Sequence, residues 1–439
     1  MLENPLPQPV LRPQRLGDEY RWIVLVTATI AQACACFLVQ GIGAMAEPLQ
    51  NAFRLNTFEL GLLVSAAQLI PLIGLLIAGE LLDRYNERYV VGIGTALVSI
   101  AIFLASEATT YHAILFCLLL VGAGYSTAQP GGSKSIATWF SQKERGFAMG
   151  IRQAGLPLGG AAAAALMPWI SFSHGWRNAF KFAAGVTLFG AIIFVIFYRS
   201  KLQARQSDHV AQKSLSNLWA MKIKDRFAMI HLPIMRKIVF SGLVMISFQT
   251  SLLLFLLLFL RDHMHLATAF SGHYLLYALL AGTIGRIVLA AWSDHCERGR
   301  FFVIRVSMLG GLLGLIVLSV LTYVSVESAG HDGANLMFLG LCIWLGFFGF
   351  GLYGPWVALV SESVPPERVG FALGLAMMVN QIAIIFCPPF FGYLKDLSHS
   401  YLPMWLMLSI GLMVALFCTI DKKKIRTKKY LRIGAGMKR

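Results

Sequence analysis

Two arginines inside long apolar stretches are the residues of this chain best able to bind a charged molecule. Arg152 lies in the segment GIRQAGLPLGG (150–160), and Arg286 lies in a second apolar stretch, eight residues before Asp294. An arginine keeps its charge inside a protein, and placing that charge in hydrocarbon costs at least a few kcal/mol. A guanidinium matches carboxylate and phosphate groups through paired hydrogen bonds. The two residues therefore predict a binding site for an anion.

Acidic partners for these arginines are missing from the sequence around them. Glu80 and Glu362 fall near the ends of apolar segments, and no Asp or Glu falls in the middle of one. A bound anion is the simplest species that would neutralise the two cations. The alternative is structural: each guanidinium reaches back to the membrane surface or caps backbone carbonyl groups at a helix end. The sequence leaves both interpretations open.

Further polar side chains are scattered through the apolar segments and could complete such a site. Residues four apart share one face of a helix, as Gln32 and Cys36 do on the first segment and Tyr125 and Gln129 do on the fourth. Each such residue alone is explained by a polar contact between helices, whereas the set suits a central aqueous site. The candidate substrate-binding residues besides the arginines are Gln32, Tyr125, Gln129, Gln153, Gln249, Tyr353, Trp356, Asn380 and Gln381.

Membrane-spanning helices must position these residues. The 439-residue chain is 57% hydrophobic and 13% charged, whereas soluble domains carry about 25% charged residues. Its apolar runs are continuous rather than alternating, which predicts helices and excludes a barrel. Each run is about 20 residues long, enough to cross a hydrocarbon core. The twelve expected spans are 22–45, 59–82, 90–107, 111–133, 147–170, 179–198, 237–260, 270–292, 302–325, 335–358, 371–393 and 401–420.

Basic residues concentrate in two segments that set the expected orientation. The formal net charge is +16, and nine Lys or Arg residues lie in 199–237 and nine more in 421–439. Loops rich in Lys and Arg stay on the cytoplasmic side, so we expect a multi-pass protein of the cytoplasmic membrane with both termini in the cytoplasm. The charge is assigned to topology, with lipid as a contact, and predicts no nucleic-acid partner.

Other classes of function find little support in the sequence. The seven cysteines show no metal-ligand spacing, and no catalytic constellation, metal site or cofactor motif is expected. A membrane-embedded enzyme would need such a constellation. A sensor built on a transporter scaffold would favour a large soluble appendage, whereas the segments outside the first and last spans are only about 20 residues long.

The chain contains an internal duplication. The segment ERGFAMG (144–150) recurs as ERVGFALG (367–374), and GELLDRYNER (79–88) recurs as AAWSDHCERGR (290–300). Parallel repeats of this kind build transporters with a binding site between the halves. The expected organisation is an N-terminal six-helix bundle (1–198), a cytoplasmic linker (199–236), a C-terminal six-helix bundle (237–420) and a basic cytoplasmic tail (421–439).

The segment GELLDRYNER resembles the signature loop between helices 2 and 3 of the major facilitator superfamily, and GWRNAF (175–180) resembles its entry into helix 6. The resemblance covers nearly the whole chain. It implies the all-α membrane fold of that family, with twelve transmembrane helices in two pseudo-symmetric bundles. An arginine on helix 8, as at Arg286, resembles the monocarboxylate-type members. In the second copy of the signature, Ala290 stands at the glycine position.

The same resemblance implies a gate at the cytoplasmic side. Gly79 would allow close helix approach, and Asp83 would face the N-terminus of helix 11, which carries a partial positive charge. These contacts would form when the cytoplasmic side is closed. The alternative is an ordinary charged turn that sets topology. The candidate gating residues are Gly79, Asp83, Arg84, Arg88 and Asp294.

Together these observations predict a secondary transporter, not an enzyme. We expect a monomer that moves a small organic anion, a carboxylate, across the cytoplasmic membrane by alternating access of its two bundles. Proton coupling stays open, since no carboxylate within a span is available as a carrier. The alternative is a neutral or amphipathic substrate, with Arg152 and Arg286 in structural roles.

Overall fold

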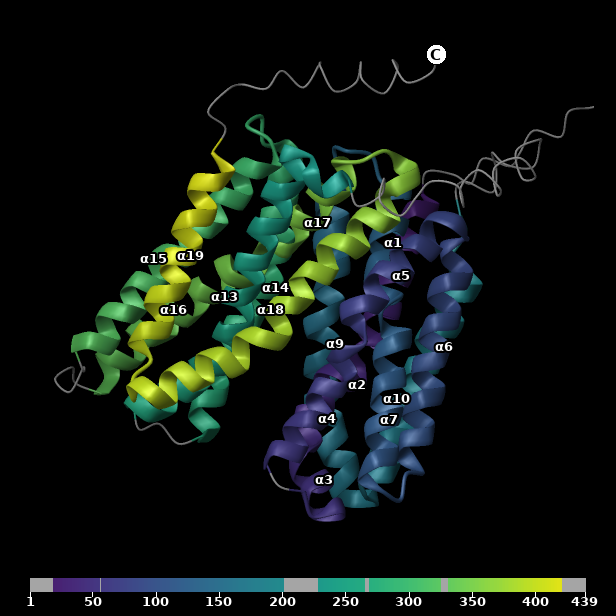
Figure 1. The fold of residues 1–439 in the computed structure, drawn as a ribbon, viewed down its shortest axis with the longest axis horizontal. Helices are drawn as coiled ribbons and strands as arrows, with labels where there is room; N and C mark the ends of the chain where they lie inside the picture. Colours follow the sequence, from purple (N-terminus) through teal and green to yellow (C-terminus); the bar gives the residue numbers. More distant parts are fainter. Residues whose placement is uncertain (1–18, 56, 201–227, 265–267, 325–330, 421–439) are drawn as a thin grey trace, which may run out of the picture.

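The structure is a computed structural model and describes residues 19–55, 57–200, 228–264, 268–324 and 331–420. Every regular element in these ranges is a helix (Figure 1). The tail 421–439 and most of the linker, on which the predicted cytoplasmic placement depends, lie outside the described residues.

Helices of the first half follow the expected spans with shifted ends. They are α1 (Tyr20–Ala35), α2 (Phe37–Gly41), α3 (Ala46–Phe53), α4 (Thr57–Leu69), α5 (Pro71–Arg84), α6 (Glu87–Ser106), α7 (Tyr111–Tyr125), α8 (Ala128–Trp139), α9 (Arg145–His174) and α10 (Trp176–Phe197). A short 3-10 segment, η1 (Ile42–Met45), joins α2 to α3.

The second half repeats the pattern. Its helices are α13 (Pro233–Met264), α14 (Thr268–His295), α15 (Arg300–Val324), α16 (His331–Gly351), α17 (Tyr353–Glu362), α18 (Val369–Ser398) and α19 (Leu402–Thr419), with 3-10 segments η2 (Ala228–His231) and η3 (Pro366–Arg368). The first of these helices begins at Pro233, within the segment expected to be linker. Proline is favoured at the first position of a helix because its missing N–H would have no partner there.

The twelve expected spans are present as helices, although not all are single rods. Among the described residues, ten helices are long and apolar enough to cross a membrane, and the bent pair Tyr20–Ala35 with Phe37–Met45 makes an eleventh. The remaining expected span, 59–82, is divided at Ile70 into α4, of 13 residues, and α5, of 14. Each part is shorter than the roughly 20 residues that a crossing needs, but together they suffice.

Four spans are interrupted near their middle, between α1 and α2, α4 and α5, α7 and α8, and α16 and α17. The first pair is bent by 46°. Pro71 explains the second break, because it has no N–H to continue the hydrogen-bond ladder. At the third, the hydroxyls of Ser126 and Thr127 donate to the carbonyl oxygens of Gly122 and Gly124 and compete with the backbone pattern.

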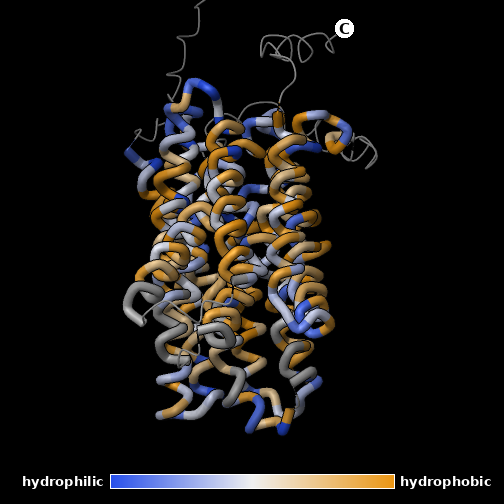
Figure 2. Tube along the Cα trace, turned by 90° about the vertical axis from the view of Figure 1, so that its left-hand side faces the viewer, coloured by the Kyte–Doolittle hydropathy of each residue, from blue (hydrophilic) through white to orange (hydrophobic). Residues whose placement is uncertain are grey.

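Hydrophobic residues run along most of the length of the helices, and hydrophilic residues gather toward both ends (Figure 2). Large apolar side chains such as Ile93, Phe116 and Phe172 are 69%, 61% and 95% exposed. In water such a surface would be unfavourable, whereas in a bilayer it is solvated by lipid. The exposed apolar surface therefore agrees with a multi-pass membrane protein.

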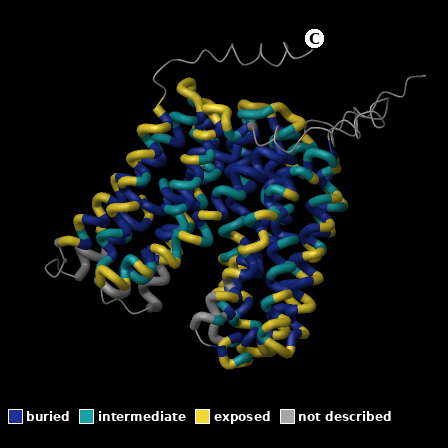
Figure 3. The backbone as a smooth tube through the Cα atoms, viewed as in Figure 1, coloured by how far each residue is buried: buried dark blue, intermediate teal, exposed yellow. Residues whose placement is uncertain are grey.

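The two halves lie side by side and meet mainly through two helix pairs, α5 with α18 and α9 with α14. We call the end that carries Asp83 and Asp294 the interlocked end, and the opposite end, near α3, the far end. The halves are close together at the interlocked end and diverge toward the far end (Figure 1). Buried residues are concentrated where the halves meet near the interlocked end (Figure 3).

Glycine permits the backbone contact between α5 and α18. A Cβ atom on Gly79 would lie 2.6 Å from the carbonyl oxygen of Gly370 and 3.1 Å from the Cα of Phe371. Both are backbone atoms that cannot rotate away, so a side chain at position 79 would force the helices apart. Close packing of this kind is the usual role of small residues between membrane helices.

Candidate functional site

A polar cavity of about 160 Å³ lies between the two halves. The first half contributes Gln40, Gln68, Pro71, Leu75, Tyr125, Gln129, Gln153 and Leu156 to its wall. The second half contributes Ile246, Gln249, Thr250, Leu253, Arg286, Tyr353, Met377, Asn380, Gln381 and Ile384. Polar groups from both halves thus converge on one space, which is the arrangement that the internal duplication predicts.

Most of the candidate residues from the sequence meet at this cavity. Those that line it are Tyr125, Gln129, Gln153, Gln249, Arg286, Tyr353, Asn380 and Gln381. Arg152, Gln32 and Trp356 do not line it in this conformation. Trp356 is instead buried within the second half, where its indole N–H donates to the carbonyl oxygen of Ile238 at 2.9 Å.

Arg286 is the one charged side chain among the described residues that line the cavity. It is 3% exposed. Its Nε donates to the carbonyl oxygen of Phe350 at 3.1 Å, and its Nη1 donates to the carbonyl oxygen of Gln153, across the two halves, at 2.7 Å. The guanidinium also lies 5.9 Å from the centre of the Tyr353 ring. Within the described part of the chain no carboxylate forms an ion pair with it.

Arg152 has a different environment, although it comes from the facing helix α9. It is fully buried. Its Nη1 donates to Ser133 Oγ at 3.0 Å, and its Nη2 donates to Gln32 Oε1 at 2.8 Å and to the carbonyl oxygens of Ala128 and Gln129 at 3.1 and 2.8 Å. These neutral oxygens hold the guanidinium away from the cavity, although the next residue in the chain, Gln153, lines it. In this conformation the guanidinium reaches neither the cavity nor the membrane surface.

The carboxamides of the cavity differ in how well they are satisfied. Gln381 Nε2 donates to the side-chain and backbone oxygens of Gln68, both at 2.9 Å, and so joins the halves. Gln129 Nε2 donates to the Tyr125 hydroxyl at 3.2 Å. Gln153 is fully buried, and neither Nε2 nor Oε1 of its side chain has a hydrogen-bond partner among the described residues. A buried amide without partners is unusual, and this one lies at the cavity.

Gln68 was missed by the sequence reasoning. It is a single amide in an apolar segment, and the only polar residue one turn away is the small Ser65. Only the crossing of α4 and α18 brings it to Gln381. Gln40 follows the four-residue spacing of Gln32 and Cys36 on the first segment and does line the cavity, whereas Gln32 does not; the helix bends by 46° between them, at Cys36.

At the interlocked end, Asp83 binds the start of a helix in the other half. Its two carboxylate oxygens accept from the backbone N–H groups of Gly370 and Phe371, each at 2.8 Å. Lys134 Nζ lies 3.2 Å from the same carboxylate. The contact that the family resemblance implies is therefore present in the structure. A carboxylate at a helix N-terminus is stabilised by the free N–H groups and by the helix dipole.

The two signature arginines do not cross between the halves. Arg84 pairs with Glu80 on its own helix. The Nε of Arg88 donates to the carbonyl oxygen of Val195 at 2.5 Å. Both contacts stay within the first half.

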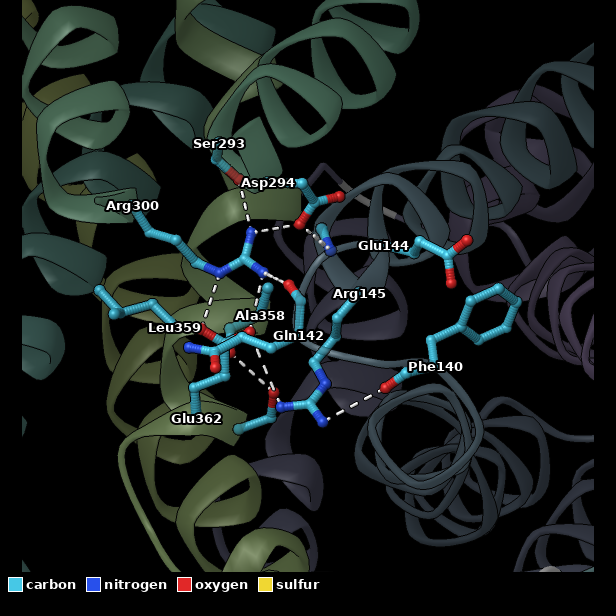
Figure 4. A network of polar contacts seen from close by, with 12 residues as sticks. Phe140, Gln142, Glu144, Arg145, Ser293, Asp294, Arg300, Ala358, Leu359 and Glu362 are labelled. Atoms are coloured by element: carbon cyan, nitrogen blue, oxygen red, sulfur yellow. Dashed lines mark hydrogen bonds and ion pairs between the residues drawn. The ribbon is translucent and has the colours of Figure 1, made fainter. Parts of the chain in front are cut away.

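Asp294, in the second half, makes the equivalent contact with the start of α9 in the first half (Figure 4). Its oxygens accept from the N–H groups of Gly146 and Phe147, each at 2.7 Å. Arg300 lies 2.7 Å from Asp294 and 2.8 Å from Glu362, and it also donates to the carbonyl oxygen of Gln142 at 2.8 Å. The duplication seen in the sequence thus becomes a reciprocal pair of carboxylate contacts between the halves.

Nothing in the described residues provides a metal site, since no three His, Cys, Asp or Glu side chains are grouped closely enough to hold an ion. The described residues that line the cavity offer hydrogen-bonding groups and one guanidinium charge. Such a wall can bind and orient a small molecule.

Known proteins resemble this chain over most of its length. It is 24% identical over 400 residues to the uncharacterized MFS-type transporter MT3072 of Mycobacterium tuberculosis (strain CDC 1551 / Oshkosh), covering 90% of this chain and 83% of the relative. It is 24% identical over 406 residues to the probable galactarate/D-glucarate transporter GudP of Escherichia coli (strain K12), covering 85% and 88%. It is 23% identical over 382 residues to multidrug resistance protein 1 of Bacillus subtilis (strain 168), covering 86% and 91%.

The fold agrees with a solved structure. The crystal structure of the MFS transporter FucP in the outward conformation superposes with a TM-score of 0.69 at 15% identity, covering 91% of this chain and 98% of FucP. The family model of the Major Facilitator Superfamily matches residues 28–388. The chain is thus a transporter rather than an enzyme, and it belongs to the Major Facilitator Superfamily.

Proposed function

We propose that this transporter moves a small organic anion, with a carboxylate as its charged group, by alternating access. The observation that carries the proposal is Arg286, a buried cation that lines the cavity and has only neutral partners among the described residues. A carboxylate would supply the missing negative charge and would match the planar fork of the guanidinium.

The relatives lend support that does not by itself decide between substrates. One of them is named for galactarate and D-glucarate, both organic anions, and another for multidrug resistance, at nearly the same identity. The wall of the cavity is therefore the stronger argument. Because no carboxylate lines it among the described residues, coupling to protons would have to use the carboxyl group of the substrate or a group outside this wall.

A neutral or amphipathic substrate is the second candidate. The observation that favours it is that both arginines already have hydrogen-bond partners, four oxygens for Arg152 and two for Arg286. Under this alternative the two guanidinium groups hold helices together and do not contact the transported molecule.

Ligand binding to the purified protein separates the two candidates. A ligand that binds only the folded state raises the melting temperature, by the equivalent of about 2.7 kcal/mol at a concentration 100-fold above its Kd. We expect stabilisation by one or more small carboxylic acids and none by their amides or alcohols of the same carbon skeleton. Equal stabilisation by an acid and its amide would contradict the anion proposal.

We further propose that the protein is a monomer in the cytoplasmic membrane and that its interlocked end faces the cytoplasm. The proposal rests on the basic residues of 199–237 and 421–439. A reporter enzyme fused after residue 210 or at the C-terminus should be active only in the cytoplasm, and one inserted at residue 330 only outside. A cytoplasmic signal at 330 would overturn this orientation.

The reciprocal contacts of Asp83 and Asp294 fit this orientation. They hold the two halves together at the proposed cytoplasmic side, while the halves diverge at the far end. We propose that the described conformation is the one that faces outward, and that transport requires the four N–H contacts to break. Lipid would contact the exposed apolar helices, and no nucleic-acid partner is proposed.

A further inference from the structure

Hydrogen-bonding groups outnumber charges at the cavity wall by a wide margin. Seven of its side chains are carboxamides, two are tyrosines and one is a threonine, whereas Arg286 is the single cation among the described lining residues. A carboxamide offers both a donor and an acceptor. A site made for carboxylate groups alone would need donors only, so the acceptors in this wall point to a ligand that also donates hydrogen bonds.

The side chain of Gln153 makes this point locally. Its backbone carbonyl oxygen accepts from Arg286 Nη1 at 2.7 Å, so the residue is adjacent to the guanidinium. Its own Nε2 and Oε1 are buried without partners among the described residues. In either orientation of the amide, its Oε1 needs a hydrogen-bond donor. An ionised carboxylate cannot donate that hydrogen bond, but a hydroxyl group can.

The charge of the wall limits the charge of the ligand. Arg286 can neutralise one carboxylate, and the second arginine, Arg152, is held behind the wall by Gln32, Ser133 and two backbone carbonyl groups. A second carboxylate on the same ligand would face amides and tyrosines. Burying an ionised carboxylate without a cation is strongly unfavourable.

We propose that the substrate is a polyhydroxylated monocarboxylate, with its carboxylate on Arg286 and a neighbouring hydroxyl on the Gln153 side chain. This inference rests on the proposed function and deepens it. The remaining carboxamides of the wall would bind the hydroxyl groups along the rest of the ligand. The site would then discriminate against two classes of acid, those without hydroxyl groups and those with a second carboxylate.

The test measures the binding of matched ligands to the full-length protein by calorimetry. The probes share one carbon chain length: the epimeric aldonates gluconate and galactonate, hexanoate without hydroxyls, galactarate with a second carboxylate, and the uncharged alditol sorbitol. We expect at least one aldonate to bind. Hexanoate and galactarate should bind about 10- to 100-fold more weakly than that aldonate, the loss expected when buried polar groups go unpaired.

The outcomes distinguish this inference from the function on which it rests. Hexanoate or galactarate binding as tightly as the better aldonate would overturn the inference and leave an organic-anion transporter. Sorbitol binding as tightly as the aldonate, or an absence of binding by every acid, would count against the proposed function as well.

A variant of Gln153 provides an independent readout. Gln153→Leu keeps the side-chain volume and removes the buried amide, so the fold should be retained. The substitution should weaken binding of the aldonate about 10-fold and leave binding of hexanoate unchanged, because only the aldonate forms a hydrogen bond with the amide. The matched control is Gln50→Leu, which removes an exposed amide on α3 outside the cavity and should change the binding of neither ligand. An equal loss of both ligands in Gln153→Leu would contradict the assigned contact.

Discussion

Arg286→Gln is expected to weaken binding of the best organic acid by about 30- to 4000-fold, which corresponds to the 2–5 kcal/mol lost when one partner of a buried charge pair is removed. The physical reason is that Arg286 is the one cation among the described residues of the cavity wall. Arg286→Lys should also weaken binding, although less, because an ammonium keeps the charge and loses the paired geometry. Calorimetric titration of the purified variants measures both effects.

The matched control for this substitution is Arg177→Gln. Arg177 also donates to a backbone carbonyl group, that of Ala108 at 2.9 Å, and lies 4.6 Å from the centre of an aromatic ring, that of Trp176. It does not line the cavity, so its loss should leave affinity unchanged. Arg152→Gln should fall between the two, since its charge acts from behind the wall. Wild-type affinity in Arg286→Gln would support the alternative in which the arginines are structural.

The double substitution Asp83→Asn with Asp294→Asn should shift the protein toward forms open at the interlocked end. Each carboxylate accepts two backbone N–H groups from the other half. An amide keeps one acceptor oxygen and loses the charge. At 0.3–2 kcal/mol for each helix-terminus contact, the population ratio should change by about 3- to 1000-fold. Each single variant should show part of this shift.

Spin-label distances report that shift directly. Labels on cysteines at Lys143 and Glu297, two exposed positions in loops of different halves, should give a short distance in the parent protein and a larger one in the double variant. Cys296, Cys387 and Cys418 would first be replaced, because none of them is buried. Asp396→Asn, at an exposed carboxylate near the other end of α18, is the control. An unchanged distance distribution in the double variant would contradict a gating role for Asp83 and Asp294 and would leave them as residues that set topology.

Helices and their duplication could be predicted from the sequence because both depend on local patterns. Continuous apolar runs gave the spans, and the repeated ER…GFA segments gave the symmetry. The second copy of the signature departs from the first at one position, and the structure shows how the helix contact is kept. Ala290 replaces the signature glycine in α14, and the structure shows the small residue on the other side of the contact, where a Cβ on Gly150 would lie 3.0 Å from the Ala290 side chain.

The directions in which the two arginines point could not be predicted in the same way. Arg152 and Arg286 have similar positions relative to the ends of their spans, and their sequence contexts suggest equivalent roles. The difference arises from neighbours distant in the chain: Gln32 and Ser133 draw Arg152 into the first half, whereas Arg286 faces the carbonyl oxygen of Gln153 across the cavity. Side-chain direction depends on tertiary contacts that no single segment encodes.

Three of the four interrupted spans break beside the cavity wall. Ile70 lies between Gln68 and Pro71, Ser126 and Thr127 lie between Tyr125 and Gln129, and Leu352 directly precedes Tyr353. Helices bend most readily where their hydrogen-bond ladder is broken. We therefore propose that the far-end segments α4, α7 and α16 bend at these breaks, at the level of the cavity. Under this proposal, inward bending would close the far end over a bound substrate while the contacts of Asp83 and Asp294 remain intact, so that occlusion and release are separate steps.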